Sequence, residues 1–253
     1  MKIFYFTATG NSMAVAKQFE GELFSIPQVM KDGGKEYTDE AIGIVFPVYA
    51  NQPPKMVQEF LEKVNLKADY YFAIATYGMM SGNPFKYVQR KAKEHGYQFD
   101  YTRTLLMVDN FLDNFDMKAE ISKIEKKNIQ GNLNTIKKEI SNRKKEEMHA
   151  GFVTNTVTKM CEPLFKKMVN GRTPEKFIVN EACIQCGICS KVCPAGNISV
   201  NDRVIFSQKC EGCYACIHAC PKNAIHLKKE KSNARWRNPE VTVNDIIYSN
   251  CQI

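Results

Sequence analysis

The stretch FYFTATGNSMAVA, residues 4–16, changes pattern abruptly near the start of the chain. An apolar run ends at Thr7, a cluster of Thr, Gly, Asn and Ser follows, and helical spacing of apolar residues begins after it. The amides and hydroxyls of residues 7–12 therefore meet at a helix N-terminus, where an anion is stabilised. The turn has neither the lysine of a Walker loop nor the spacing of a G-x-G-x-x-G turn. The alternative interpretation is an ordinary capped turn between a strand and a helix.

The alternation of strand and helix continues over roughly the first 115 residues. Apolar β-like runs cover residues 2–6, 23–26, 41–46, 70–76 and about 102–107, and helical patterns cover 12–20, 53–64 and 84–95. Two of these helices open with proline, which the first turn tolerates. The crossover over residues 27–40 is short and poorly defined. This order predicts an α/β fold, a doubly wound parallel sheet covered by helices on both faces.

Two further helical segments follow the last predicted strand. The first runs from Lys118 to about Glu147 with an apolar stripe along one side, and the second covers residues 153–169. The segment NGRTPEK, residues 170–176, then breaks the pattern. We therefore expect an α/β domain over residues 1–150, a helical linker over 151–175, a small cysteine-rich domain over 176–230 and a C-terminal tail over 231–253.

Eight of the ten cysteines form an internal repeat. Each copy reads C-x2-C-x2-C-x3-C-P, in CIQCGICSKVCP and CEGCYACIHACP, and the copies are 27 residues apart. In the bacterial two-cluster pattern the fourth cysteine ligates the other cluster. The spacing predicts two [4Fe-4S] clusters, with ligands Cys183, Cys186, Cys189 and Cys220 for one and Cys193, Cys210, Cys213 and Cys216 for the other. The alternative, a pair of tetrahedral zinc sites, gives the third cysteine of each copy no role.

Two other side chains lie inside the second copy of the motif. We expect His218 to face solvent, because the loop backbone already offers donors to the sulfurs; the alternative is a hydrogen bond to a sulfur. Tyr214 is expected to be a core residue of the small domain rather than a shield for a cluster.

Candidate cofactor-binding residues lie where three predicted strands end. The loop FPVYANQPP, residues 46–54, follows the third strand, and TYGMMSGNP, residues 76–84, follows the fourth. Ligands in open α/β sheets sit at these carboxyl ends. With the turn after the first strand, the candidates are Thr7, Ala8, Thr9, Gly10, Asn11, Ser12, Pro47, Tyr49, Ala50, Asn51, Thr76, Tyr77, Gly78, Met79 and Ser81.

The T-x-T-G-N-S turn resembles that of flavodoxin, and the whole chain is similar to fusions of flavodoxin with a bacterial 2[4Fe-4S] ferredoxin, known mostly from anaerobes. The segments LLMVDNFLDNF, residues 105–115, and RWRNPEVT, residues 235–242, take part in this resemblance. It implies a five-stranded flavodoxin-like sheet of order 2-1-3-4-5 over residues 1–150, with FMN at the switch point. It also implies an α+β ferredoxin domain over 176–230, and Tyr49 and Tyr77 beside the isoalloxazine.

Charge and hydropathy narrow the range of partners. The formal charge is +8, but two clusters and a flavin phosphate, at about −2 each, would bring it to roughly +2. The basic residues are dispersed, so we expect no nucleic acid partner. No apolar stretch is long enough to cross a bilayer, and the chain opens on a strand rather than a signal peptide. These features favour a cytoplasmic protein without a membrane partner.

A flavin takes up two electrons and each cubane passes one, so the resemblance implies a relay. The first hypothesis is an electron-transfer flavo-iron–sulfur protein that serves a redox partner protein. The second is a flavin-dependent reductase of a small molecule, supplied with electrons through the clusters. The third is a redox sensor that holds clusters but no flavin. We find no nucleophile and base arrangement, and the direction of flow and the oligomeric state stay open.

Overall fold

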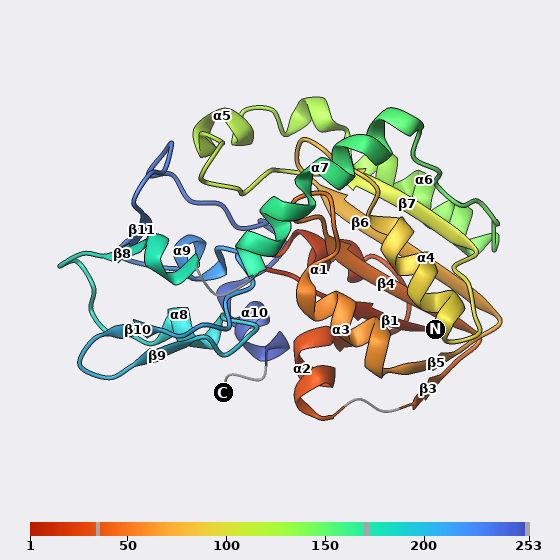
Figure 1. Ribbon diagram of the computed structural model, residues 1–253, viewed down its shortest axis with the longest axis horizontal. Coiled ribbons are helices and arrows are strands. Elements are labelled where there is room, and N and C mark those ends of the chain that lie inside the picture. Colours follow the sequence, from red (N-terminus) through yellow and green to blue (C-terminus); the bar gives the residue numbers. More distant parts are fainter. Residues whose placement is uncertain (34–35, 170–172, 251–253) are drawn as a thin grey trace.

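A computed structural model describes residues 1–33, 36–169 and 173–250 (Figure 1). Five strands form one parallel sheet: β1 (Lys2–Tyr5), β2 (Glu22–Ser25), β4 (Ala41–Pro47), β6 (Tyr70–Tyr77) and β7 (Tyr101–Leu106). Their order is β2-β1-β4-β6-β7. Numbered along the chain within this sheet, that is 2-1-3-4-5, the predicted flavodoxin-like topology. The switch point lies between β1 and β4.

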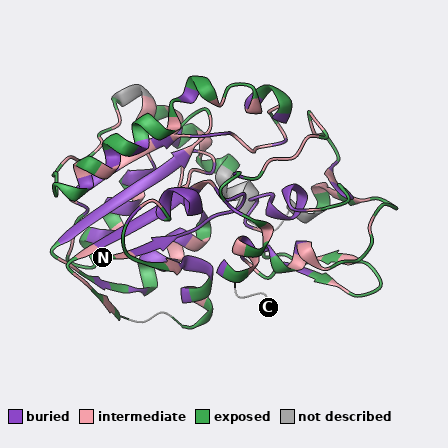
Figure 2. Ribbon diagram, turned by 180° about the vertical axis from the view of Figure 1, so that it is seen from behind, coloured by how far each residue is buried: buried purple, intermediate pink, exposed green. Residues whose placement is uncertain are grey.

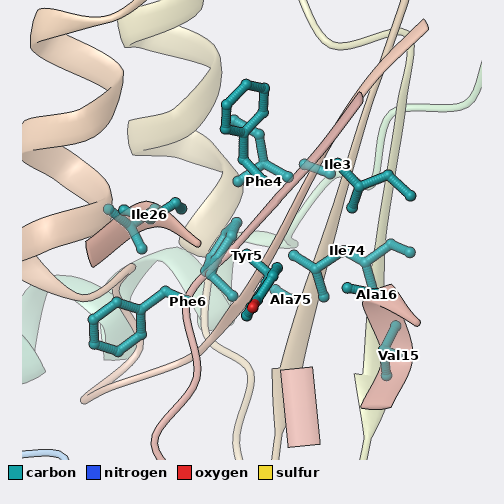
Figure 3. Close-up of a cluster of buried hydrophobic side chains, with 14 of the residues drawn as sticks. Ile3, Phe4, Tyr5, Phe6, Val15, Ala16, Ile26, Ile74 and Ala75 are labelled. Atoms are coloured by element: carbon teal, nitrogen blue, oxygen red, sulfur yellow. The ribbon is translucent and has the colours of Figure 1, made fainter. Parts of the chain in front are cut away.

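Both faces of this sheet are covered, which is why its strands read as apolar runs. Figure 3 shows Phe6 on the side of Ile26 and Ile3 on the side of Ile74 and Ala16. Ala16 belongs to α1 (Asn11–Ala16) and Ile26 to α2 (Ile26–Lys31). The helices α3 (Lys55–Lys63) and α4 (Pro84–Glu94) continue the layer of α2. Figure 2 shows the strands as the buried centre of this half of the molecule.

The predicted helical stretch from Lys118 to about Glu147 is confirmed only in part, because it is not continuous and ends at Ser141. The structure has three short helices there, α5 (Met117–Ile121), η1 (Glu125–Lys127) and α6 (Ile129–Ser141). The break falls at Asn128, whose φ of 45° lies in the left-handed region, which asparagine tolerates better than most residues. Only α6 buries its part of the apolar stripe, and it packs against β7. The crossover over residues 27–40 also contains two elements that the sequence did not predict. They are most of α2 and a strand β3 (Glu36–Thr38), which pairs with β5 (Asn65–Lys67).

One glycine of the sheet has no room for a side chain. A Cβ on Gly43 in β4 would lie 2.0 Å from the Cζ atom of Phe72, its partner in β6. We therefore expect Gly43→Ala to lower the free energy of unfolding by about 1–3 kcal/mol, because the ring must move within a packed core. Urea unfolding measures this. Part of the loss should return in Gly43→Ala combined with Phe72→Leu, and an unchanged midpoint in the single variant would contradict the contact.

The C-terminal domain repeats a small unit, and the structural repeat has the same period as the cysteines. Its elements are β8 (Phe177–Val179), α8 (Ile188–Lys191), β9 (Ile198–Val200), β10 (Val204–Phe206), α9 (Ala215–His218) and β11 (Ile225–Leu227). The first three recur 27 residues later as the last three. The strands pair across the copies, β8 with β11 and β9 with β10, both antiparallel. The two copies therefore form one unit.

Three connecting segments join this unit to the sheet. The helix α7 (Phe152–Val169), followed by η2 (Thr173–Lys176), lies between the two halves in Figure 1. The segment after β7 packs into the core of the cysteine-rich domain, where Val108, Leu112 and Met117 are buried. The tail contains α10 (Val243–Ser249). Of the predicted break at 170–176, residues 170–172 lie outside the described residues, as do Gly34 of the crossover and 251–253 of the tail. The domain boundaries stay predictions.

Candidate functional site

The eight cysteines of the repeat line two separate cavities. The outer cysteine cavity is lined by Cys183, Cys186, Cys189 and Cys220, and the inner cysteine cavity by Cys193, Cys210, Cys213 and Cys216. Each cavity thus combines three cysteines of one copy with the fourth cysteine of the other. This is the grouping that the spacing predicts for two cubanes. The role of each cysteine as a ligand stays a prediction.

The backbone around these cysteines also follows the repeat. The backbone is in the left-handed conformation at equivalent positions of the two copies, with φ 75° at Gly187 in the first and φ 59° at Tyr214 in the second. The amide of Asn197 donates to the Cys193 sulfur at 3.3 Å, and that of Ala224 to Cys220 at 3.2 Å. Such bonds stabilise a thiolate. Burial raises the pKa of the Cys189 thiol to about 11, so iron binding would have to displace its proton.

An interdomain cavity lies at the carboxyl ends of β1, β4 and β6. It is lined by all of the predicted cofactor-binding residues except Gly10 and Ser81: Thr7, Ala8, Thr9, Asn11, Ser12, Pro47, Tyr49, Ala50, Asn51, Thr76, Tyr77, Gly78 and Met79. Ser81 follows Met80, the last residue of this loop that lines the cavity. Gly10 faces the C-terminal tail instead of the cavity. Neither residue lines the cavity, and the role of both in cofactor binding stays a prediction.

The turn after β1 presents buried hydroxyls whose oxygens already accept hydrogen bonds. Thr7 Oγ1 accepts from the Gly10 amide at 3.1 Å, and Thr9 Oγ1 accepts from Asn110 Nδ2 at 2.8 Å. Each hydroxyl keeps its own hydrogen for donation. Ser12 and Thr76 share a hydrogen bond of 2.9 Å, which ties the turn to the end of β6. The turn is therefore a rigid set of donors without a lysine or arginine.

The loop after β4 forms a two-residue turn with an unusual backbone. Tyr49 and Gln52 exchange two backbone hydrogen bonds, of 2.9 and 3.0 Å, around Ala50 and Asn51. Both central residues have positive φ, 46° and 67°, as a type I′ turn requires, at some cost for residues other than glycine. The Tyr49 hydroxyl is buried and has no hydrogen-bond partner among the described residues. It is an unsatisfied polar group at the cavity wall.

The segment after β7, for which the sequence alone indicates no role, forms another part of this wall. Asp109 is half-buried, and its partial desolvation raises the pKa of its carboxyl, whose Oδ1 atom accepts from the Phe111 amide at 2.9 Å. Behind the wall, Lys127 and Glu120 form a buried ion pair at 3.5 Å, and Lys127 Nζ donates to the Gly78 carbonyl at 3.4 Å. The loop after β6 is thus held from behind by buried charges.

The cysteine-rich domain supplies the last part of the wall. Gly212, Cys213 and Tyr214 line the interdomain cavity, and Cys213 and Tyr214 also line the inner cysteine cavity. The Tyr214 ring stacks on Phe111 with centroids 5.7 Å apart, and its hydroxyl bonds Asp113. Tyr214 is buried, as expected, but its contacts join the two domains. The interdomain cavity and the inner cysteine cavity are therefore adjacent, with Cys213 and Tyr214 in the wall of both.

The expectation that His218 faces solvent is wrong. Its ring is 7% exposed, because the helix α9 that carries it packs under the segment after β7. Nε2 lies 3.0 Å from the Asn110 carbonyl, and Nδ1 accepts from the Trp236 amide at 3.1 Å. These partners fix a neutral ring with its hydrogen on Nε2, and burial lowers its pKa to about 4. His218 thus joins α9 to the cavity wall and to the tail.

The C-terminal tail supports the turn after β1 from outside the cavity. The Asn238 amide donates to the Thr9 carbonyl at 2.8 Å, and its side chain donates to Asn11 Oδ1 at 3.2 Å. Val241 packs on Gly10, where a Cβ would lie 2.8 Å from the Val241 Cβ. Further on, Asn250 Nδ2 donates to the Val192 carbonyl at 2.9 Å. The tail therefore links the turn to the cysteine-rich domain, a role that nothing in its local pattern indicates.

One side of the interdomain cavity is closed by α7. Cys161 and Leu164 of this helix line the cavity. The helix is attached to the end of the loop after β6, because Asn83 Nδ2 donates to Asn155 Oδ1 at 2.6 Å and the Asn83 amide to Thr158 Oγ1 at 3.0 Å. The predicted linker is therefore part of the cavity wall.

Comparison with known proteins addresses the two halves separately. Residues 175–221 match the model of a family described as a 4Fe-4S dicluster domain. A search of curated proteins found no match. Among solved structures, the chain is similar to a "Putative flavoprotein" from Bacteroides uniformis, with 17% identity and a TM-score of 0.33 over 47% of this chain and 94% of that one. A second, from Bacteroides eggerthii, has 18% identity and a TM-score of 0.33 over 48% and 92%. The rubredoxin oxygen:oxidoreductase of Desulfovibrio gigas has 15% identity and a TM-score of 0.31 over 53% and 36%.

The chain combines a flavodoxin-like fold, defined by its sheet topology, with a 4Fe-4S dicluster domain at residues 175–221. Eight cysteines in a dicluster domain imply two [4Fe-4S] clusters rather than zinc sites. Within the described residues no group of three or more His, Cys, Asp or Glu could hold a single metal ion. No helix in the part of the chain that the structure describes is long and apolar enough to cross a membrane. The flavodoxin-like sheet topology and the 4Fe-4S dicluster domain together define a redox or electron-transfer protein.

Proposed function

We propose that the chain is an electron-transfer protein that binds FMN in the interdomain cavity and relays electrons between this flavin and two [4Fe-4S] clusters. The observation that carries this proposal is the position of Cys213. It lines both the interdomain cavity and the inner cysteine cavity. A flavin and a cluster in these cavities would be neighbours, which is the arrangement that a relay requires.

The residues of the interdomain cavity fit an FMN. The hydroxyls of Thr7 and Thr9 still have hydrogens to donate to a phosphate, and the unsatisfied Tyr49 hydroxyl offers a polar contact at the other part of the wall. The wall is otherwise formed by apolar and uncharged side chains, apart from Asp109. A cofactor site typically has this composition. When bound, the flavin supplies two-electron chemistry and the clusters supply one-electron conduction.

The chain's own residues would bind, orient and shield these groups. The turn from Thr7 to Ser12 would hold the phosphate, and the loops after β4 and β6 would enclose the ring system. Tyr214, Phe111 and α7 would keep water from the space between the cavity and the inner cysteines. In the described wall of the interdomain cavity no side chain is placed as a nucleophile beside a base, and Asp109 supplies its carboxyl group.

The test is an anoxic absorbance spectrum of the purified protein, with iron, sulfide and flavin quantified on the same sample. We expect about eight irons and one FMN per chain. Iron without flavin would contradict the relay and would favour a sensor that holds clusters only. Zinc in place of iron would contradict both.

The hydroxyls of the turn give a sharper test of where FMN binds. Replacing Thr9 and Ser12 together by leucine removes donors to the phosphate and should weaken flavin binding at least about tenfold, because bonds to a charged group are lost. The iron content should not change. Thr135→Leu, at an exposed threonine of α6, is the control. Full flavin occupancy in the double variant would show that the phosphate lies elsewhere.

A second candidate function is a flavin-dependent reductase of a small molecule. It is favoured by the extent of the interdomain cavity, whose wall continues past the predicted flavin residues to Asn114, Phe115 and Leu164. A substrate could lie there beside the ring. Oxidation of the reduced protein by a panel of small acceptors, with and without a protein acceptor, distinguishes the carrier from the reductase.

A further inference from the structure

The two cysteine cavities differ in how they are covered. The inner one is the better covered, because Cys193, Cys213 and Cys216 are each less than a tenth exposed, only Cys210 of its four cysteines is partly exposed, and Tyr214 with Phe177 covers it. The outer one reaches the surface. Cys186 in its wall is exposed, and the neighbouring Ile184 is 59% exposed.

The three cavities also form a series. The interdomain cavity and the inner cysteine cavity share Cys213, while the interdomain and outer cavities share no residue among those that line them. The chain crosses twice between the inner and outer sets, from Cys189 to Cys193 through the end of α8 and from Cys216 to Cys220 through the end of α9. The helices α8 and α9 are in contact. From the inside outward, the order is therefore the interdomain cavity, the inner cysteine cavity, the outer cysteine cavity and the surface.

We propose that the loop Ile184–Cys186 is the electron port of this chain, and that its partner is a one-electron redox protein. This inference rests on the proposed function. In the reducing direction, two molecules of the reduced partner each lose one electron at the port. The electrons pass singly to the outer and then the inner cluster, and both, with two protons from solvent, reduce the flavin. In the opposite direction the same two electrons leave singly through the port to two oxidised partners.

The rival entry point is the loop after β6, where Met79 and Met80 are 60% and 47% exposed beside the interdomain cavity. A partner docked there would meet the flavin directly and bypass both clusters. The exposed cysteine favours the other entry, because a protein partner can reach the outer cluster without displacing α7 or the segment after β7. By contrast, Met79 and Met80 line the interdomain cavity together with α7 and the segment after β7, so a partner docked there would meet these two elements.

The test compares three single charge insertions at exposed apolar residues. Ile184→Glu lies at the port, Met80→Glu at the rival entry, and Ile178→Glu, at a 44% exposed residue of β8, is the matched control. The donor is a reduced bacterial ferredoxin, and cluster and flavin reduction are followed by stopped-flow absorbance. We expect Ile184→Glu alone to slow reduction by about tenfold, since a charge would replace an apolar side chain at the centre of the contact. Reduction by dithionite should be unchanged.

A second measurement does not depend on transfer rates. Native protein is oxidised stepwise with ferricyanide and the released thiols are alkylated and located by mass spectrometry. The outer set, Cys183, Cys186, Cys189 and Cys220, should be labelled first, while Cys213 and Cys216 stay protected.

Three results would overturn the proposal that Ile184–Cys186 is the electron port. Slower reduction in Met80→Glu with a normal Ile184→Glu overturns the port, as does equal slowing in Ile178→Glu or earlier labelling of the inner set. Failure of the proposed function has a different signature, because the protein would then contain no flavin. In that case the donor ferredoxin would still reduce the clusters, and Ile184→Glu would still slow this step.

Discussion

Cys193→Ala should lose the cluster of the inner cysteine cavity and keep that of the outer one. Cys193 belongs to the first copy of the motif, yet it lines the cavity of Cys210, Cys213 and Cys216. If it is a ligand there, its removal leaves three thiolates for a cubane that needs four. Iron should fall from about eight to about four per chain. The reciprocal variant, Cys220→Ala, should instead lose the outer cluster.

Alkylation of native protein identifies which cluster is lost. In Cys193→Ala the thiols of Cys210, Cys213 and Cys216 should become reactive, while the outer set stays protected. Cys161→Ala is the matched control, because Cys161 lies outside the motifs, and its removal should change neither the iron content nor the labelling of the eight motif cysteines. If Cys193→Ala instead exposed Cys183 and Cys189, each copy of the motif would hold its own cluster and the crossed grouping would be wrong. Cys193→Ser repeats the test if the alanine variant does not fold.

The cysteine grouping was predictable because the information is local and repeated. The spacing of Cys183, Cys186 and Cys189 fixes one loop, and the same spacing 27 residues later fixes an equivalent one. The sheet order was predictable for a related reason. Alternating strands and helices restrict the topology to a few solutions, and the turn from Thr7 to Ser12 resembles one particular family.

The segment after β7 could have been predicted from the sequence as part of the cavity wall. The segment LLMVDNFLDNF follows β7, whose carboxyl end lies at the same edge of the sheet as those of β1, β4 and β6. The rule that ligands sit at these ends applies to it equally. Asn110, which donates to Thr9, could have been proposed on that basis.

Other parts of the wall carried no usable signal. Cys213 and Tyr214 have local roles in a cluster motif, and only the packing of two domains brings them to the interdomain cavity. His218 ends the helix α9, and its ring is held by Asn110 and Trp236, which are distant in sequence. The apolar stripe over residues 121–140 is regular, yet the chain breaks its helical path at Asn128, whose backbone is left-handed.

Gly10→Ala should weaken flavin binding although Gly10 does not line the interdomain cavity. Gly10 has a φ of 96°, where an alanine is strained, and the new Cβ would lie 2.8 Å from the Val241 Cβ and 3.2 Å from the Asn238 Cβ. The turn or the tail must therefore move, and the turn carries the hydroxyls of Thr7 and Thr9. We expect a loss of stability of about 2–5 kcal/mol, the sum of backbone strain and overpacking.

Gly96→Ala separates these two causes. Gly96 has a similar φ of 81°, but a Cβ at this position would have no other atom within 4 Å, so this variant carries the backbone strain alone, about 1–2 kcal/mol. Urea unfolding measures both variants, and flavin content reports on the turn. Gly96→Ala should keep its flavin and Gly10→Ala should lose it.

The contact between the turn and the tail can then be isolated with a double-mutant cycle. In a Val241→Gly background the Cβ that opposes residue 10 is absent, so Gly10→Ala should cost less than in the parent chain. A cost that is the same in both backgrounds would mean that the tail does not constrain the turn. A smaller cost, with flavin restored, would mean that residues 238–241 hold the turn in its binding geometry. The tail would then couple the cysteine-rich domain to the flavin site, since Asn250 beyond it bonds the Val192 carbonyl.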